Sequence, residues 1–154
     1  MSAAIEVQRA CAAPGVPPPA KLVEWAEAAL DGRRDGARMT VRVVDEAEGA
    51  ELNERYRGTE GATNVLAFGF DAPEVPSVRI LGDIVVCAPV AAREAREHSK
   101  RLDAHWAHLV VHGTLHLLGY DHDEPGDAAE METLEREILD RLGYPDPWAA
   151  GDGP

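Results

Sequence analysis

Hydrophobic residues recur along the chain with two different periods, and these periods predict strands mainly in the first half and helices mainly in the second. Short segments rich in Val, Ile, Leu and Phe, or with apolar residues at every second position, are typical of strands. Four segments fit this description: 5–8, 39–45, 63–70 and 79–87. In the second segment, Val41 and Val43 share one face, as they do in a half-buried strand.

Apolar residues at helical spacing, together with start and stop signals, predict five helices. The first begins in a Pro-rich segment and ends at Gly32, with an apolar face formed by Leu22, Trp25, Ala26, Ala29 and Leu30. The second has Asp45 as its predicted N-cap and ends near Gly58. Three more are predicted over 89–101, 103–118 and 127–142. The last has four apolar residues at core spacing, and its Glu residues are expected to face solvent: Met131, Leu134, Ile138 and Leu142.

This order of elements predicts an α+β fold, a single domain in which one mixed sheet of about four strands packs with about five α-helices. The 154 residues suit one domain, and no repeat or long linker divides them. We therefore expect one domain over 1–154, with 149–154 as a flexible tail. The chain has no apolar run long enough to span a membrane, and its first residues lack the plan of a signal peptide. A cytoplasmic protein without a membrane partner is the expectation.

Composition narrows the function classes only slightly. Two cysteines exclude a disulfide framework and a Cys-rich zinc module. A net charge of -13 argues at first against a nucleic-acid partner, because phosphate binding favours a basic surface. However, residues 121–154 hold 11 acidic and 2 basic side chains, so most of the net negative charge lies in this last segment. A basic groove elsewhere in the protein remains compatible with the sequence.

All six histidines lie between positions 98 and 122, and three of them have the spacing of a metal site. His112 and His116 are four residues apart and therefore share one helical face. Gly119 is expected to end the helix in a left-handed conformation, so that the chain turns back and His122 approaches the same ion. Three protein ligands leave the fourth position to water, which is typical of a catalytic zinc site that supplies hydroxide near neutral pH.

The spacing H-x3-H-x2-G-x2-H is that of the metzincin proteases, which bind zinc with a zincin-like helix and turn. One residue within the pattern differs. Gly113 replaces the Glu that serves those proteases as general base, so the pattern indicates a hydrolase that is not a protease. His105 and His108 continue the stripe and are interpreted as supporting, substrate-facing or structural residues. Two acidic residues flank His122 and either orient an imidazole or stabilise the turn: Asp121 and Asp123.

The histidine segment HGTLHLLGYDH at 112–122 resembles the signature of the YbeY family, the bacterial rRNA maturation endoribonucleases. Further blocks are similar to that family: LNERYRGTEGATNVLAFGF at 52–70, LGDIVVC at 81–87, AHWAHLVVHG, and the closing LGYPDPW. The resemblance covers roughly positions 40–148. Two positions depart from the family pattern, Ala67 where Ser is usual and Gly69 where Pro is usual, and both lie outside the metal motif.

The resemblance implies a zinc-dependent endoribonuclease specific for single-stranded RNA, acting in small-subunit (16S) rRNA 3′-end maturation and in ribosome quality control. It implies His112, His116 and His122 as zinc ligands, and Arg57 as a catalytic residue beside His112 and His116. The Arg57 guanidinium can hold a phosphodiester by two hydrogen bonds and offset the charge of the transition state. Without the resemblance, an Arg at a helix end would be interpreted as a salt-bridge or dipole partner. The implied partners are precursor rRNA and small-subunit ribosomal proteins, without DNA.

A second candidate RNA contact is the basic face of the predicted helix 89–101. Arg93, Arg96 and Lys100 lie at i, i+3 and i+7, where they could follow an RNA backbone. Glu94 and Glu97 lie on the same helix, so an ordinary solvated face explains the pattern equally well.

Two other functions stay open at this point. One is a zinc metallopeptidase or another metallohydrolase of the same design, which Gly113 disfavours. The other is a ribosome assembly factor in which the metal is structural and the work is binding. The attacking group is also open, because either a metal-activated water or the RNA 2′-hydroxyl fits the residues. The metal could be an ion other than zinc, since a three-His site accepts several.

Overall fold

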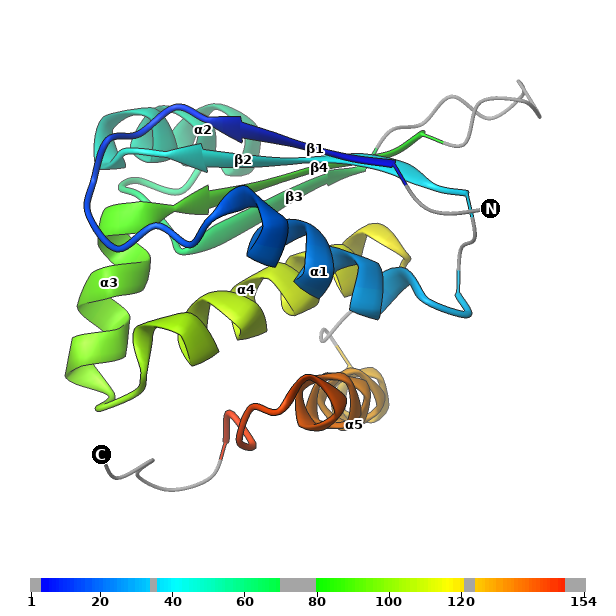
Figure 1. The fold of residues 1–154 in the computed structure, drawn as a ribbon. Helices are drawn as coiled ribbons and strands as arrows, with labels where there is room; N and C mark the ends of the chain where they lie inside the picture. Colours follow the sequence, from blue (N-terminus) through cyan, green and yellow to red (C-terminus); the bar gives the residue numbers. More distant parts are fainter. Residues whose placement is uncertain (1–3, 34–35, 70–79, 121–123, 149–154) are drawn as a thin grey trace.

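Four strands form one mixed sheet, as the sequence predicts. The computed structural model of the protein describes residues 4–33, 36–69, 80–120 and 124–148. The strands are β1 (Ala4–Arg9), β2 (Arg38–Val44), β3 (Val65–Gly69) and β4 (Ile80–Cys87). They lie in the order β1-β2-β4-β3 (Figure 1). β1, β2 and β4 are parallel, whereas β3 pairs antiparallel with β4 and forms one edge of the sheet.

Five helices complete the predicted α+β fold. They are α1 (Pro19–Leu30), α2 (Glu46–Arg57), α3 (Ala88–Glu97), α4 (Leu102–Leu117) and α5 (Pro125–Leu142). The local signals work as expected at the start of α2, where the Asp45 side chain accepts a hydrogen bond of 2.9 Å from the backbone N–H of Glu48. Within the described residues, none of these helices combines the length and the apolar character that a membrane span needs.

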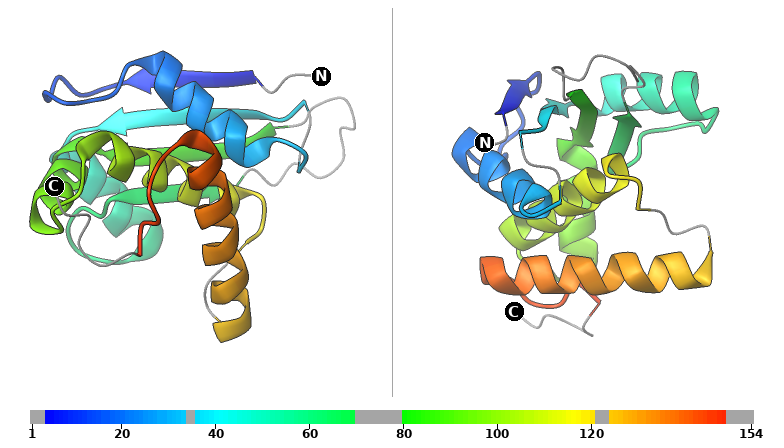
Figure 2. Two further views of the ribbon diagram at one scale, coloured as in Figure 1. Left: turned by 60° about the horizontal axis from the view of Figure 1, so that its bottom comes forward. Right: turned by 90° about the vertical axis from the view of Figure 1, so that its right-hand side faces the viewer.

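The helices cover both faces of the sheet (Figure 2). On one face, Leu52 of α2 packs against a small apolar cluster: Val44, Leu66, Val85, Cys87 and Val90. The other face carries the main core, to which α1, α4 and α5 all contribute. Its members include Trp25 of α1, Trp106 of α4 and Met131 of α5, packed with Val41 and Ile84 of the sheet. α4 therefore lies between the sheet and α5, and both sides of this helix contact protein.

α3 ends earlier than the sequence predicts, at Glu97 rather than near position 101. Ser99 adopts a left-handed conformation with φ of 53°. The backbone N–H of Lys100 donates to the carbonyl of Ala95 at 2.8 Å, and that of Ser99 donates to Arg96 at 3.3 Å. This pair of bonds is a Schellman motif, which glycine usually makes. Lys100 therefore lies beyond the helix, and the predicted helical face ends before it.

Candidate active site

α4 presents four histidines along one stripe, and the first two candidate metal ligands lie together on it. The ring centroids of His112 and His116 are 4.6 Å apart. The helix ends as predicted, because Gly119 has φ of 102° and the N–H of Tyr120 donates to the carbonyl of Leu115 at 3.1 Å. The third candidate ligand, His122, lies outside the described residues. The flanking acidic residues Asp121 and Asp123 lie outside them as well, as do residues 149–154.

A groove with a volume of about 910 Å³ runs between α4, the edge strand β3 and the end of α2. Arg57, His112 and His116 all line it, together with Gly113 and residues 63–69. The structure thus brings together the predicted catalytic arginine and two predicted metal ligands, although more than fifty positions separate them in the sequence. A cationic side chain and two imidazoles therefore face the same space.

Two residues at the end of α2 face this groove, and each is held by its local structure. Arg57 is the last residue of the helix, and Gly58 ends it in a left-handed conformation with φ of 68°. The Arg57 side chain is exposed and, among the described residues, pairs with no acidic group. Tyr56 is 60% exposed, and its ring rests edge-on against Phe68 of β3, with 5.2 Å between the ring centroids. A cation and an aromatic ring therefore lie side by side at the rim.

Gly113 of α4 packs against two residues of the sheet, Ile84 and Val65. A Cβ atom at this position would lie 3.0 Å from Cγ2 of Ile84 and 3.1 Å from Cγ2 of Val65. Such distances are shorter than ordinary van der Waals contacts. The position that carries the general-base Glu in the metzincins is tightly packed here, so even a methyl group would require its neighbours to move by a few tenths of an ångström.

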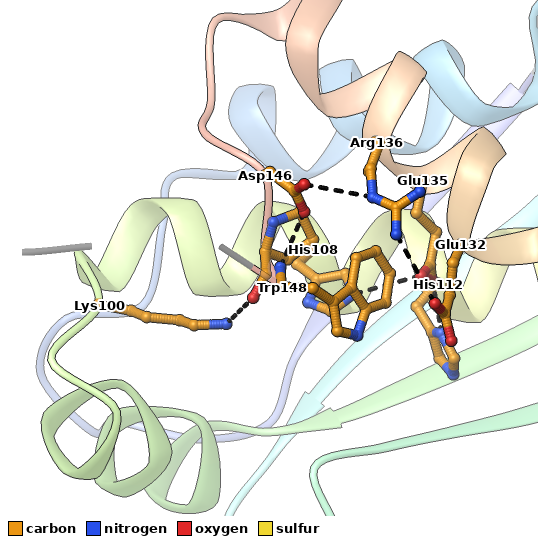
Figure 3. Close-up of polar contacts among 9 residues, drawn as sticks. Lys100, His108, His112, Glu132, Glu135, Arg136, Asp146 and Trp148 are labelled. Atoms are coloured by element: carbon orange, nitrogen blue, oxygen red, sulfur yellow. Dashed lines mark hydrogen bonds and ion pairs between the residues drawn. The ribbon is translucent and has the colours of Figure 1, made fainter. Parts of the chain in front are cut away.

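Glu135 of α5 is a site residue that the sequence reasoning missed. The prediction that the Glu residues of this helix face solvent is wrong for Glu135, which is 1% exposed. Its carboxylate lies 2.6 Å from Nδ1 of His112 and 3.4 Å from Nε2 of His108 (Figure 3). The sequence contains a signal for the burial of this carboxylate, since Glu135 stands at core spacing between Met131 and Ile138. A carboxylate at a core position points to a buried polar partner.

Electrostatics agree with a charged Glu135. Burial alone would raise the pKa of its carboxyl group, but the hydrogen bonds and charges of His108 and His112 outweigh burial and lower the pKa to about 2. The ligand atoms of His108, His112 and Glu135 lie within 4.8 Å of one another and could hold a metal ion. Imidazole nitrogen and carboxylate oxygen are both zinc ligands, so the donor chemistry of the site fits a metal.

His105 has a contact of another kind, directed at α3 rather than at the groove. Its Nε2 lies 2.9 Å from Oε1 of Glu94. Burial lowers the pKa of His105, although the nearby Glu94 acts in the opposite direction. This contact joins α4 to α3 and is a structural role for His105.

The predicted basic face lies apart from the groove, since its three residues are not among those that line it. Arg93 is 3.6 Å from Glu46 of α2, and Arg96 is exposed. Lys100 donates from Nζ to the carbonyl of Pro147 at 2.6 Å, and so holds the segment that follows α5 (Figure 3). Binding of RNA by these residues stays a prediction, and it would require the RNA to extend beyond the groove.

Known proteins match the chain over nearly its whole length. A sequence model of the family described as Endoribonuclease YbeY matches residues 18–143. A protein named endoribonuclease YbeY from Pseudomonas entomophila is 55% identical, over 94% of this chain and 92% of its own. A protein of the same name from Nitrosococcus oceani is 51% identical, over 96% of this chain and 98% of its own.

One solved structure supports the fold independently of the names. The solution structure of a Thermotoga maritima protein has a TM-score of 0.61 and 27% sequence identity, and the match covers 90% of this chain and 88% of that one. The histidine stripe of α4, the groove beside it and these matches lead to one conclusion. The chain belongs to the YbeY family of endoribonucleases.

Proposed function

We propose that this protein is a zinc-dependent endoribonuclease that cleaves single-stranded RNA in the 3′-end maturation of small-subunit rRNA and in ribosome quality control. His112, His116 and His122 would hold the metal ion. Arg57 would bind the phosphate that is cleaved. The observation that carries the proposal is the shared groove, in which Arg57, His112 and His116 face the same space.

Arg57 contributes positioning and charge. Its guanidinium can donate two parallel hydrogen bonds to phosphate oxygens, which aligns the phosphodiester and stabilises the negative charge that develops during cleavage. Among the residues that the structure describes, Arg57 has no acidic partner that would compete with a bound phosphate. A bound zinc ion would supply a Lewis acid that activates water or polarises a phosphate oxygen.

Tyr56 supports the preference for single strands. Its ring is 60% exposed at the rim of the groove, beside Arg57. An unpaired base can stack on such a ring, whereas a base inside a duplex is already stacked on its neighbours. Phosphate binding by Arg57 and stacking on Tyr56 together describe a site for a flexible, single-stranded chain.

The position of β3 at the edge of the described sheet supports one alternative, a metallopeptidase. An extended peptide could add to this edge as a further strand, next to the candidate metal ligands. Gly113 opposes this function, since the usual general base is missing and Ile84 and Val65 crowd the position that it would occupy. The remaining alternative, an assembly factor with a structural metal, predicts RNA binding without cleavage.

The proposed partners follow from the activity. Precursor rRNA is the substrate, and basic small-subunit ribosomal proteins suit the acidic surface of the chain, whose net charge is -13. No DNA partner is expected. The place of action would be the cytoplasm, where ribosomal subunits mature in bacteria.

The experiment combines metal analysis with RNA cleavage. The metal content of the purified protein and cleavage of a single-stranded RNA are measured for the wild type, His116→Ala, Arg57→Ala and the control Arg55→Ala. Arg55 lies on the same helix end but pairs with Glu51 at 2.9 Å. We expect His116→Ala to lose both metal and cleavage. Arg57→Ala should keep the metal and lose about 10²- to 10³-fold in rate, and Arg55→Ala should resemble the wild type.

Two outcomes would contradict the proposal, and a third would identify the attacking group. Cleavage that survives the loss of metal in folded His116→Ala would exclude metal-dependent catalysis. Efficient cleavage of peptides without any effect on RNA would favour the peptidase. A product ending in a 2′,3′-cyclic phosphate would exclude direct attack by water and assign the 2′-hydroxyl as the nucleophile.

A further inference from the structure

Glu135 reaches the candidate metal site from a different helix than the histidines. α5 packs on the side of α4 that faces away from the sheet (Figure 1), and the Glu135 carboxylate contacts imidazoles from two successive turns of α4 (Figure 3). Within the described residues, its partners are His108 and His112. We propose that Glu135 is a positioning residue that fixes the tautomer and the ring orientation of His112 for metal binding. This inference rests on the proposed function, in which His112 is a metal ligand.

The distance between Glu135 and His112 favours a hydrogen bond over shared coordination of one ion. Oε2 of Glu135 lies 2.6 Å from Nδ1 of His112. Two ligands of a tetrahedral zinc ion, each about 2.0 Å from the metal, lie roughly 3.3 Å from each other. The observed separation is shorter than this and matches a charge-assisted hydrogen bond, in which Nδ1–H donates to the carboxylate.

The hydrogen bond decides which nitrogen of His112 can bind a metal. A proton held on Nδ1 leaves the lone pair on Nε2, at the other side of the ring. His112 also lines the groove, where His116 and Arg57 lie. A carboxylate that accepts from the distal N–H of a metal-binding histidine holds its ring in place and makes the ligand more basic.

Burial argues against a purely structural role for Glu135. Its neighbours in the core on the same helix are apolar, Met131 and Ile138, and each of the three residues is 1% exposed. An apolar residue at position 135 would fill the same space without the cost of burying a charge. A carboxylate at this position is explained by its partners, the imidazoles of His108 and His112.

His108 and the segment after α5 hold the carboxylate in its orientation. The His108 ring lies between two aromatic neighbours, with centroids 5.1 Å from Trp148 and 6.1 Å from His112. Trp148 is held in turn by Arg136, whose guanidinium carbon lies 5.4 Å from the centre of its ring. One oxygen of Glu135 thus faces a packed imidazole, and the other faces the candidate ligand.

Nitrogen NMR of the imidazole rings tests the inference without metal. In the metal-free wild type near pH 8, we expect His112 to carry its proton on Nδ1. In Glu135→Leu, we expect a mixture of the Nδ1–H and Nε2–H tautomers. In Glu135→Gln, which keeps an oxygen acceptor, the fraction of His112 protonated on Nδ1 should lie between the fractions in the wild type and in Glu135→Leu. Glu137→Gln is the control, since Glu137 lies on the exposed face of the same helix. An unchanged tautomer in both Glu135→Gln and Glu135→Leu would overturn the inference.

Zinc affinity, measured by competition with a coloured chelator, gives a second readout. We expect Glu135→Gln to bind zinc about 10- to 100-fold more weakly than the wild type, and Glu137→Gln to bind it normally. Thermal unfolding of the metal-free variants separates this effect from stability, because a merely structural residue would change the melting temperature alone. A His108→Ala variant that loses zinc as completely as His116→Ala would instead assign His108 and Glu135 as ligands. Failure of the proposed function is recognised separately, by wild-type protein that does not cleave RNA.

Discussion

Replacing Gly113 by Ala tests how tightly α4 packs against the sheet beside the candidate metal ligands. The new methyl group would lie 3.0 Å from Ile84 and 3.1 Å from Val65, so these side chains or the helix must move by a few tenths of an ångström. Both neighbours are β-branched and belong to paired strands, so neither can rotate away easily. Overpacking of this kind costs about 1–3 kcal/mol, and we expect the upper half of that range.

A second effect acts in the opposite direction. Ala stabilises a helix interior by about 1 kcal/mol relative to Gly. The free energy of unfolding should therefore fall by about 1–2 kcal/mol in Gly113→Ala, which lowers the melting temperature by about 2–8 °C for a domain of this size. Urea titration and thermal melts of the metal-free protein measure the change directly.

Gly126 of α5 provides a matched control. It lies in a helix and is exposed, and apart from its chain neighbours and the helix backbone no atom of the described residues lies within 4 Å of the position that a Cβ would take. Gly126→Ala should stabilise the protein by up to about 1 kcal/mol, since only helix propensity acts there. If Gly113→Ala proves as stable as the wild type while Gly126→Ala behaves as expected, the close packing of α4 against the sheet is refuted.

Three further predictions concern other parts of the molecule. Tyr56→Ala should weaken the binding of single-stranded RNA by about 5- to 150-fold, the loss of one stacked base, while Tyr56→Phe binds normally; equal binding by both would exclude stacking. Burial lowers the pKa of His105 in the folded protein, so the unfolded chain takes up a proton more readily below about pH 6.5 and stability falls as the pH drops. His105→Gln should flatten this dependence between pH 7.5 and 5.5 in urea titrations, and an unchanged slope would contradict the assignment. Ser99→Gly should raise the urea midpoint, with a gain of about 0.5–1 kcal/mol, because glycine adopts the left-handed conformation without strain; a lower midpoint would contradict this reasoning.

Features that depend on neighbours in the chain could be predicted well. The buried face of α1 consists of the five residues expected from their spacing, Asp45 caps α2, and Gly119 ends α4. These signals are local, since a cap or a helical face is determined within a few residues. The end of α3 was missed because Ser99 takes a conformation that the sequence suggests only for glycine.

The residues of the candidate site also differ in whether local sequence signals are enough to predict their positions. The sequence by itself determined the helix that carries His112 and His116 and the turn that follows it, because helical periodicity and one glycine are enough. Only the tertiary structure decided that Arg57 faces the same groove, since this depends on β3 lying at the sheet edge beside α4. It also decided that Glu135 contacts His112, because the packing of α5 on α4 involves residues more than twenty positions apart. Local periodicity shows which side of a helix is buried, but the partner on that side is set by long-range packing.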